Sequence, residues 1–474
     1  MRQSGGWVGF NSSNKAVPPF LNICYINQYA PYEDSVENPG LTEKLIIHGG
    51  KALRGEVEIS GAKNSVLKLM AATLLTGDSI ELRNVPHLSD VGVMTQVLKH
   101  LGCDVDQQDD DRLYIQAKNI TSCEAPYDLV RKMRASFDVL GSLLGRFGEA
   151  RVALPGGCSI GKRSVDLHVK GLMALGAEVE INHGYVEAKA SRLVGAEILL
   201  DTPSVGATEN IMLAATMAEG STILSNAAQE PEIVDLANFL NAMGADISGA
   251  GTNEIVINGV KPGTLHGTTY SVMPDRIEAA TYLMAGVGTL GDVTVNNVLP
   301  VHLSSLTHKL IEMGADIEMP TPNSIRIRSE RRLQAQNIVT QPYPGFPTDL
   351  QAPFMTLLST ADGVSIVKET IYENRFKQVG ELKRMGADIS VERDVAVITG
   401  VPHLSGAEVN AHDLRAGAAM VIAGVMAEGA TQVFDLHHLD RGYEDVVAKM
   451  QTLGATIERV PDNSERPVSE ETSA

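Results

Sequence analysis

The stretch Met243-Gly244-Ala245-Asp246-Ile247 recurs, with small changes, five more times along the chain. Apolar residues at helical spacing come before each copy, and alternating apolar and polar residues follow it. Each copy therefore predicts the end of a helix and the start of a strand. The six copies are spaced 68 to 74 residues apart, with their glycines at positions 102, 176, 244, 314, 386 and 454.

A second repeated pattern alternates with the first. An Ala-, Leu- and Met-rich stretch ends at a glycine, and a short strand such as Ser79 to Leu82 follows it. In both patterns we expect Gly to take the left-handed conformation that closes a helix, since it has no Cβ. Each unit then reads as a βαβαββ-type repeat. The glycines of this second pattern stand at positions 77, 148, 220, 291, 363 and 429.

Six such units divide into two α/β domains of three units each. A chain of 474 residues is also too long for one compact core. A solenoid of stacked repeats is the competing architecture, but solenoid repeats are usually shorter, at roughly 20–50 residues. The repeat length therefore favours two α/β domains.

Composition excludes several classes of protein. A net charge of −19 argues against nucleic acid or an anionic membrane as a general partner, although it leaves room for a small anionic substrate bound by a local cluster of cations. No apolar run reaches membrane-spanning length. Four widely spaced cysteines without a CxxC pair favour a reducing, cytoplasmic compartment and argue against a metal site. We expect a monomer without a cofactor.

Two glycine-containing stretches carry candidate chemistry. In Gly61-Ala62-Lys63-Asn64 the lysine could hold a phosphate, but the local pattern favours a solvated turn lysine. In the loop from Leu154 to Arg163, Lys162 and Arg163 would lower the pKa of Cys158, which favours a reactive thiol over an inert one. The loop also nearly matches a nucleotide P-loop, but Arg163 stands where that motif has Ser or Thr.

Several arginines and one aspartate are candidates whose roles depend on the fold. Asp349 follows Phe346-Pro347-Thr348, so it reads first as a helix N-cap and only second as a general base. An arginine fork grips carboxylates and phosphates, but a single arginine is more often a solvated surface residue. Only a shared cleft would make a site of the candidates Arg134, Arg276, Arg375, Arg415 and Arg441.

These motifs together closely resemble the family of UDP-N-acetylglucosamine 1-carboxyvinyltransferases, the enolpyruvyl transferases of peptidoglycan synthesis. The resemblance runs from about Leu45 to Val460 and keeps the order of the motifs. The matching stretches are Gly61 to Asn64, Met133 to Ser136, Pro155 to Arg163, Ser204 to Thr208, Glu230 to Ile233, Pro274 to Glu278, Phe346 to Asp349, Glu373 to Phe376, Asp413 to Ala416 and Asp440 to Tyr443.

The resemblance implies the enolpyruvyl transferase fold, with two inside-out α/β domains of three units each. The chain is expected to cross between the domains near Lys63 and near Met273 to Asp275. The implied ranges are an extension of uncertain order at 1–44, one domain at 45–62 plus 274–460, a domain carrying the cysteine loop at 63–273, and a disordered tail at 461–474.

The resemblance also implies an activity and the residues that carry it. The enolpyruvyl group of phosphoenolpyruvate would move to the 3-hydroxyl of UDP-N-acetylglucosamine by addition and elimination, with release of phosphate. Cys158 would donate a proton to the methylene carbon, and Asp349 would take the proton of the sugar hydroxyl. Lys63 and Arg441 complete the catalytic set. The implied phosphoenolpyruvate ligands are Lys63, Asn64, Arg134, Arg163, Arg375, Arg415 and Arg441.

A second implied set lines the pocket for the UDP-sugar. It comprises Asn64, Arg134, Arg163, Ser164, Val165, Asp166, Leu167, Thr202, Pro203, Ser204, Val205, Asp349 and Ile371. Four positions depart from common family patterns: Lys68 and Ser164 stand where many members have proline, and Ser89 and Thr202 where some members carry lysine. The alternatives are a shikimate-type enolpyruvyl transferase, disfavoured by Asn64 and the cysteine loop, and a non-catalytic UDP-sugar-binding paralogue.

Overall fold

The computed structural model of the chain describes residues 42–108, 111–155 and 165–462. Within these ranges the strands form six four-stranded sheets of one common pattern. In each sheet one of the two edge strands runs parallel to its neighbour, and the other two pairs of neighbouring strands are antiparallel. The six predicted repeats are therefore confirmed as six copies of one sheet.

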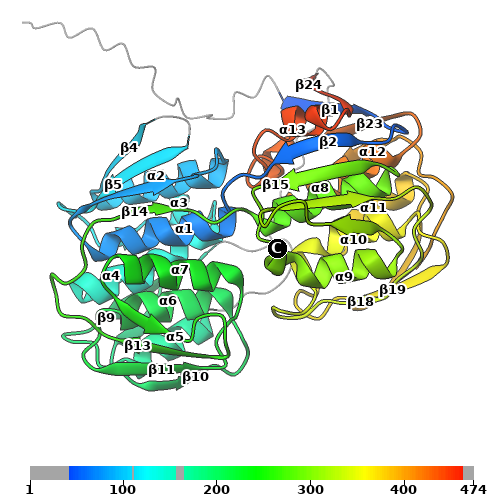
Figure 1. Cartoon of the computed structure of the whole chain (residues 1–474). Helices are drawn as coiled ribbons and strands as arrows, with labels where there is room; N and C mark the ends of the chain where they lie inside the picture. Colours follow the sequence, from blue (N-terminus) through cyan, green and yellow to red (C-terminus); the bar gives the residue numbers. More distant parts are fainter. Residues whose placement is uncertain (1–41, 109–110, 156–164, 463–474) are drawn as a thin grey trace, which may run out of the picture. The chain divides into compact units, whose positions relative to one another are not determined.

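Three of the sheets surround one hydrophobic core (Figure 1). The first consists of β14 (Thr269–Ser271), β3 (Ser79–Arg83), β5 (Arg112–Gln116) and β4 (Asp104–Gln108). The second consists of β6 (Glu124–Ala125), β7 (Glu149–Ala153), β9 (Tyr185–Lys189) and β8 (Glu178–Asn182). The third consists of β10 (Glu197–Leu199), β11 (Ser221–Ser225), β13 (Glu254–Asn258) and β12 (Asp246–Ser248).

The other three sheets surround a second core and include the first two strands of the described residues. The fourth sheet consists of β2 (Arg54–Glu58), β15 (Asp292–Asn296), β17 (Ser324–Arg328) and β16 (Asp316–Glu318). The fifth consists of β18 (Ile338–Val339), β19 (Val364–Lys368), β21 (Val395–Thr399) and β20 (Asp388–Glu392). The sixth consists of β22 (Glu408–Asn410), β23 (Ala430–Phe434), β1 (Thr42–His48) and β24 (Thr456–Asp462). β1 begins at Thr42, two residues before the predicted end of the extension at residue 44.

The helices lie inside the sheets, which is the inside-out arrangement that the resemblance implied (Figure 1). The first core holds α1 (Lys63–Ala72), α2 (Ser89–Leu101), α3 (Tyr127–Val130), α4 (Val139–Phe147), α5 (Asp166–Ala174), α6 (Val205–Ala215) and α7 (Pro231–Ala242). The second holds α8 (Arg276–Gly288), α9 (Ser304–Glu312), α10 (Gln351–Leu358), α11 (Gln378–Arg384), α12 (Leu414–Met426) and α13 (Val446–Thr452).

Burial explains why some of these helices lack a polar face. In α8 every residue from Arg276 to Val287 is buried, and α12 is buried nearly throughout. A helix that is apolar all round has to be enclosed by other elements.

Three units around each core confirm the predicted fold class and argue against the solenoid. The exact domain boundaries stay a prediction. No helix of the described ranges is long and apolar enough to cross a membrane.

The repeated glycines follow the predicted conformation with two exceptions. The six glycines of the first pattern have φ between 86° and 104°, and four of the second pattern also have positive φ. Gly77 and Gly291 do not, so the expectation of a left-handed residue was wrong there. At Gly291 a Cβ would overlap the carbonyl oxygen of Leu53. Close backbone packing therefore requires Gly at that position.

Candidate active site

Lys63 is positioned where two passes of the chain run side by side. Gly61 forms an antiparallel bridge with Pro274, and a Cβ at Gly61 would overlap the backbone of Asn84. The backbone N–H of Lys63 donates to Oδ2 of Asp275 at 3.1 Å. Asp275 in turn caps α8 by accepting from the first N–H groups of that helix. The start of α1 and the start of α8 are thus tied together at Lys63.

The side chain of Lys63 belongs to a charge cluster with the buried Asp90 and with Arg441, whose side chain is 36% exposed. Lys63 Nζ lies 2.7 Å from Asp90 Oδ2, and Arg441 Nε donates to Asp90 Oδ1 at 2.9 Å. Burial lowers the pKa of Lys63, and the nearby cations of Arg441 and Arg415 lower it further. Burial would raise the pKa of Asp90, but Lys63 and Arg441 outweigh it and hold that pKa below its usual value. Two cations therefore share one buried counter-ion.

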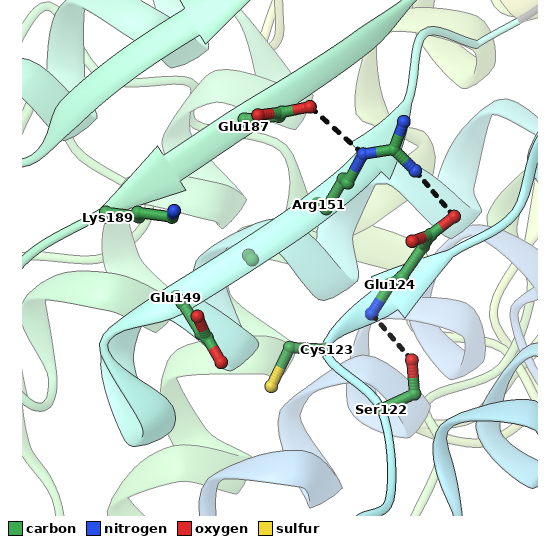
Figure 2. Close-up of a pocket in the computed structure, with 8 residues that line it drawn as sticks. Ser122, Cys123, Glu124, Glu149, Arg151, Glu187 and Lys189 are labelled. Carbon is green, nitrogen blue, oxygen red and sulfur yellow. Dashed lines mark hydrogen bonds and ion pairs between the residues drawn. The ribbon is translucent and has the colours of Figure 1, made fainter.

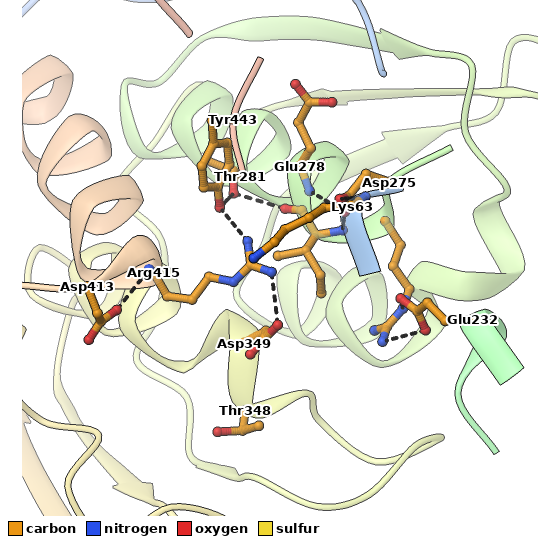
Figure 3. A network of polar contacts seen from close by, with 12 residues as sticks. Lys63, Glu232, Asp275, Glu278, Thr281, Thr348, Asp349, Asp413, Arg415 and Tyr443 are labelled. Atoms are coloured by element: carbon orange, nitrogen blue, oxygen red, sulfur yellow. Dashed lines mark hydrogen bonds and ion pairs between the residues drawn. The ribbon is translucent and has the colours of Figure 1, made fainter. Parts of the chain in front are cut away.

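Asp349 sits between two buried arginines. Arg375 Nη2 donates to Oδ1 of Asp349 at 2.7 Å, and Arg415 Nη2 donates to Oδ2 at 2.9 Å. Figure 3 shows Asp349 and Arg415 meeting from separate segments, with Lys63 reaching toward the Arg415 guanidinium. The local pattern favoured an N-cap role for Asp349, but its side chain caps no helix and pairs with arginines instead.

The two arginines determine the acidity of Asp349. Burial would raise the pKa of Asp349, but Arg415 and Arg375 outweigh it and hold the pKa well below its ordinary range. Arg375 also donates from Nη1 to Thr348 Oγ1 at 2.9 Å, and Arg415 Nη1 donates to the Tyr443 hydroxyl at 3.4 Å. Asp349 is thus an ionised acceptor in a rigid, cationic setting.

Arg276 is brought into the same region but is committed to a carboxylate of the protein. Its Nε and Nη2 donate to Glu232 at 3.1 and 3.2 Å, in a two-point pair that is almost fully buried. Such a pair joins residues of the two cores. Arg276 therefore reads as a structural residue rather than as a substrate ligand.

The predicted UDP-sugar ligands lie at the starts of two neighbouring helices. Val165 precedes α5, whose first two residues are Asp166 and Leu167. Ser204 caps α6 by accepting from the N–H of Ala207. Helix N-termini carry unpaired N–H groups and a positive dipole end, which suit an anionic ligand. Four further members of this set are Thr202 and Pro203, both exposed, Val205 at the start of α6, and Ile371, which is half-buried.

Arg134 and Asn64 also lie at helix starts. Arg134 is the first residue of the 3₁₀ helix η2 (Arg134–Asp138), and Asn64 is the second residue of α1. Both positions place a polar side chain at the opening turn of an element of the first core. Three further predicted residues, Cys158, Arg163 and Ser164, lie outside the described residues.

A separate surface pocket lies over the sheet of β6, β7 and β9 (Figure 2). Arg151 pairs there with Glu124 at 2.6 Å and with Glu187 at 3.0 Å, and its guanidinium stacks over Tyr185. Cys123 also lines this pocket, and burial raises the pKa of its thiol. None of the predicted site residues that the structure describes lines it.

Sequence reasoning missed several residues that hold the site together. Asp90 is the central one, because it lies between Lys63 and Arg441. At the start of a helix it looks like an ordinary complement to the helix dipole, so no local pattern could reveal it. Asp275 and Asp413 are also structural, since both cap helices beside site residues. The resemblance had placed both in matching motifs without giving them a role.

Comparison with known proteins identifies the family. The family model for EPSP synthase (3-phosphoshikimate 1-carboxyvinyltransferase) matches residues 47–450. UDP-N-acetylglucosamine 1-carboxyvinyltransferase 2 of Carboxydothermus hydrogenoformans is 55% identical over 421 residues, which are 89% of this chain and 100% of the relative. The Clostridium botulinum UDP-N-acetylglucosamine 1-carboxyvinyltransferase is 54% identical over 88% of this chain and 100% of its own.

Solved structures share the fold. The enolpyruvyl transferase NikO from Streptomyces tendae has a TM-score of 0.80 and 27% identity, covering 90% of this chain and 100% of its own. An EPSP synthase from Acinetobacter baumannii has a TM-score of 0.66 and 19% identity, covering 88% of this chain and 100% of its own, which supports the fold alone. With near full-length relatives above 50% identity, the chain belongs to the enolpyruvyl transferase family and groups within it with the UDP-N-acetylglucosamine 1-carboxyvinyltransferases.

Proposed function

We propose that this chain transfers the enolpyruvyl group of phosphoenolpyruvate to the 3-hydroxyl of UDP-N-acetylglucosamine and releases phosphate. The supporting observation is the pair of charge clusters around Asp90 and Asp349, which concentrate Lys63, Arg375, Arg415 and Arg441 in a chain of net charge −19. Phosphoenolpyruvate carries a phosphate and a carboxylate, and preorganised cations of this kind bind both groups and stabilise the departing phosphate. The names of the relatives supply the acceptor.

The proposed chemistry needs one acid and one base on opposite reacting atoms. Cys158 donates a proton to the methylene carbon of phosphoenolpyruvate, while the sugar 3-hydroxyl oxygen bonds to the neighbouring carbon. Asp349 accepts the hydroxyl proton. In the second step the carbon–oxygen bond to phosphate breaks and phosphate leaves, while the methyl group gives a proton back to the Cys158 thiolate, which restores the carbon–carbon double bond. Lys63, Arg134, Arg163 and Arg441 hold the anionic groups through both steps.

The state of Asp349 suggests how the base becomes active. A carboxylate paired with two arginines is a weak base, because its pKa lies well below neutrality. Arg375 and Arg415 are also proposed ligands of phosphoenolpyruvate. Once the anionic substrate draws either guanidinium toward itself, the pKa of Asp349 rises toward its usual range. Substrate binding thereby prepares Asp349 to accept the hydroxyl proton.

The test is phosphate release from phosphoenolpyruvate, with UDP-N-acetylglucosamine or shikimate 3-phosphate as acceptor. We expect turnover with the UDP-sugar only. A folded sample that releases no phosphate with either acceptor would be a non-catalytic paralogue, and turnover only with shikimate 3-phosphate would assign the shikimate-type reaction. A cytoplasmic location, a monomeric state and a role in peptidoglycan precursor synthesis are part of the same proposal.

A further inference from the structure

A chain of hydroxyl groups leads away from Arg415, beyond the residues assigned to the reaction (Figure 3). Arg415 Nη1 donates to the Tyr443 hydroxyl at 3.4 Å, and that hydroxyl lies 3.0 Å from Thr281 Oγ1. Thr281 Oγ1 lies 2.9 Å from the backbone carbonyl oxygen of Ile277. Arg415, Tyr443 and Thr281 are all buried. Water therefore has little access to the chain, and each polar hydrogen has to find an acceptor within the protein.

The two ends of the chain determine the direction of its hydrogen bonds. A guanidinium can only donate, so the Tyr443 oxygen accepts from Arg415. A backbone carbonyl can only accept, so the hydroxyl hydrogen of Thr281 points to Ile277. The Tyr443 hydrogen then donates to Thr281 Oγ1, which gives every hydrogen of the chain an acceptor. Burial also raises the pKa of Tyr443, so the hydroxyl keeps this hydrogen at neutral pH and presents Arg415 with an acceptor oxygen.

The same chain ties Arg415 to the helix that holds the backbone of Lys63. Thr281 lies on α8, and its hydroxyl is bound to the first turn of that helix. Asp275, which caps α8, also accepts from the backbone N–H of Lys63. Arg415 and Lys63, both proposed ligands of phosphoenolpyruvate, are thus held by the start of one helix.

The two arginines on Asp349 divide their nitrogen atoms in the same way. An arginine and a carboxylate frequently pair through two parallel hydrogen bonds. Within the described residues, each arginine instead donates to Asp349 from Nη2 alone, at 2.7 Å for Arg375 and 2.9 Å for Arg415. A hydroxyl holds Nη1 in both cases, that of Thr348 for Arg375 and that of Tyr443 for Arg415. The hydroxyl acceptors therefore keep each guanidinium from turning both nitrogens to the carboxylate.

We propose that Tyr443 is a positioning residue for Arg415: its hydroxyl holds Nη1 of the guanidinium away from Asp349, which leaves Nη2 free to pass from Asp349 to phosphoenolpyruvate. This inference rests on the proposed function, in which Arg415 binds the anionic donor substrate. Without the hydroxyl, both nitrogens close on Asp349, and the substrate has to break two charge-assisted hydrogen bonds instead of one. Tyr443 acts through Arg415 and not on the substrate itself.

The test compares Tyr443→Phe with the wild type by the KM of each substrate and by kcat. We expect the KM for phosphoenolpyruvate to rise about tenfold, because one more charge-assisted hydrogen bond has to be broken. The KM for UDP-N-acetylglucosamine changes less than about twofold. At saturating phosphoenolpyruvate Arg415 lies on the substrate in both proteins, so kcat falls less than about threefold. An unchanged KM for phosphoenolpyruvate, or an equal rise in both KM values, overturns the proposal.

Tyr282→Phe is the matched control. Tyr282 is also a buried tyrosine of the second core, but its hydroxyl has no hydrogen-bond partner in the part of the chain that the structure describes. The substitution removes the same kind of atom without disturbing Arg415, so both KM values stay at the wild-type level. If Tyr282→Phe raises the KM for phosphoenolpyruvate as much as Tyr443→Phe does, the effect reflects loosened packing and the proposal fails.

Two substitutions of Thr281 test the direction of the chain. Thr281→Val keeps the shape of the side chain but removes the acceptor of the Tyr443 hydrogen, so Tyr443 no longer has to accept from Arg415. The KM for phosphoenolpyruvate then rises about threefold, the effect of one neutral hydrogen bond. Thr281→Ser keeps the hydroxyl and loses a methyl group, so this KM stays at the wild-type level. A rise in Thr281→Ser as large as in Thr281→Val, or no rise in Thr281→Val, overturns the proposal.

Folding and function are separated from the positioning role by two further measurements. Circular dichroism and thermal unfolding show whether each variant is folded, and the Thr281 pair decides the outcome if Tyr443→Phe does not fold. Wild-type turnover is measured first. If the wild type releases no phosphate from phosphoenolpyruvate, the proposed function fails; if it does but the KM pattern is absent, only the role of Tyr443 fails.

Discussion

Arg441 Nε donates a hydrogen bond to Asp90 Oδ1 at 2.9 Å, although 351 positions separate the two residues in the chain. Lys63 binds the other oxygen of the same carboxylate. Asp90 therefore fixes two cations of the proposed donor site from opposite ends of the sequence. Its side chain is only 3% exposed, so water contributes little to solvating this carboxylate.

Replacement of Asp90 by Asn is expected to destabilise the protein and to weaken phosphoenolpyruvate binding. Removing one member of a buried charge cluster leaves uncompensated cations, at a cost of about 3 kcal/mol. Urea unfolding at pH 7 measures the loss, and the KM for phosphoenolpyruvate reports the misplacement of Lys63 and Arg441. Asp316→Asn is the control, because Asp316 forms an exposed pair with Arg328 and its loss is expected to change little. Equal stability of the two variants would contradict this role for Asp90.

Replacement of Asp349 by Asn tests the proposed base. The amide keeps one acceptor oxygen for an arginine, but its nitrogen is a donor and it cannot take a proton. We expect the kcat for phosphate release to fall by about a hundredfold to ten-thousandfold, while the protein remains folded by circular dichroism. A variant that keeps more than about a third of the wild-type kcat would exclude Asp349 as the base, because loss of a general base slows a reaction by about a hundredfold or more.

Asp349 also predicts a pH dependence of stability. Its pKa is lowered in the folded protein, so the arginine pairs stabilise the fold fully above the unfolded pKa of about 3.9 and less as pH falls below it. The free energy of unfolding of the wild type should therefore exceed that of Asp349→Asn at pH 5, and this difference should shrink as the pH is lowered toward 3. A difference between the two proteins that stays constant over this range would show that Asp349 is not held ionised by its partners.

The sequence predicts the architecture well because the signals are local and repeated. The helix-closing glycines and the strand patterns occur six times, so an ambiguity in one copy is resolved by the others. The exceptions at Gly77 and Gly291 arise because spacing alone cannot distinguish a left-handed residue from one required by close packing. Packing depends on a distant segment, as the contact of Gly291 with Leu53 illustrates.

The candidate site could be predicted from residues only in part. Local pattern favoured a solvated Lys63 and an N-capping Asp349, yet both are committed to charge pairs formed by distant segments. Asp90 could not have been singled out, because its partner Arg441 lies near the other end of the chain. The resemblance supplied what local physics could not, since ordered motifs encode a shared fold that brings separate segments together.

His168 provides a further test of the first core. Burial lowers its pKa to about 3, with the cations of Arg134 and Lys68 adding to the effect. The folded protein keeps His168 neutral while the unfolded chain takes up a proton near pH 6.5. Stability is therefore fully present above pH 6.5 and declines below it, by up to about 1.4 kcal/mol per pH unit. Relative to His168→Gln, the wild type should lose stability between pH 6.5 and 5, whereas replacement of the exposed His308 should leave the slope unchanged.

Thiol reactivity distinguishes the proposed catalytic cysteine from the structural ones. Burial raises the pKa of Cys103 to about 12 and also raises that of Cys123, so both thiols stay protonated at neutral pH and react slowly. Lys162 and Arg163 beside Cys158 favour its thiolate. Since the family resemblance implies alkylation by fosfomycin, we expect peptide mass spectrometry to find one adduct on Cys158 and none on Cys103 or Cys123. Cys158→Ser should abolish the adduct, and modification of Cys123 ahead of Cys158 would contradict the proposed acidity of the loop thiol.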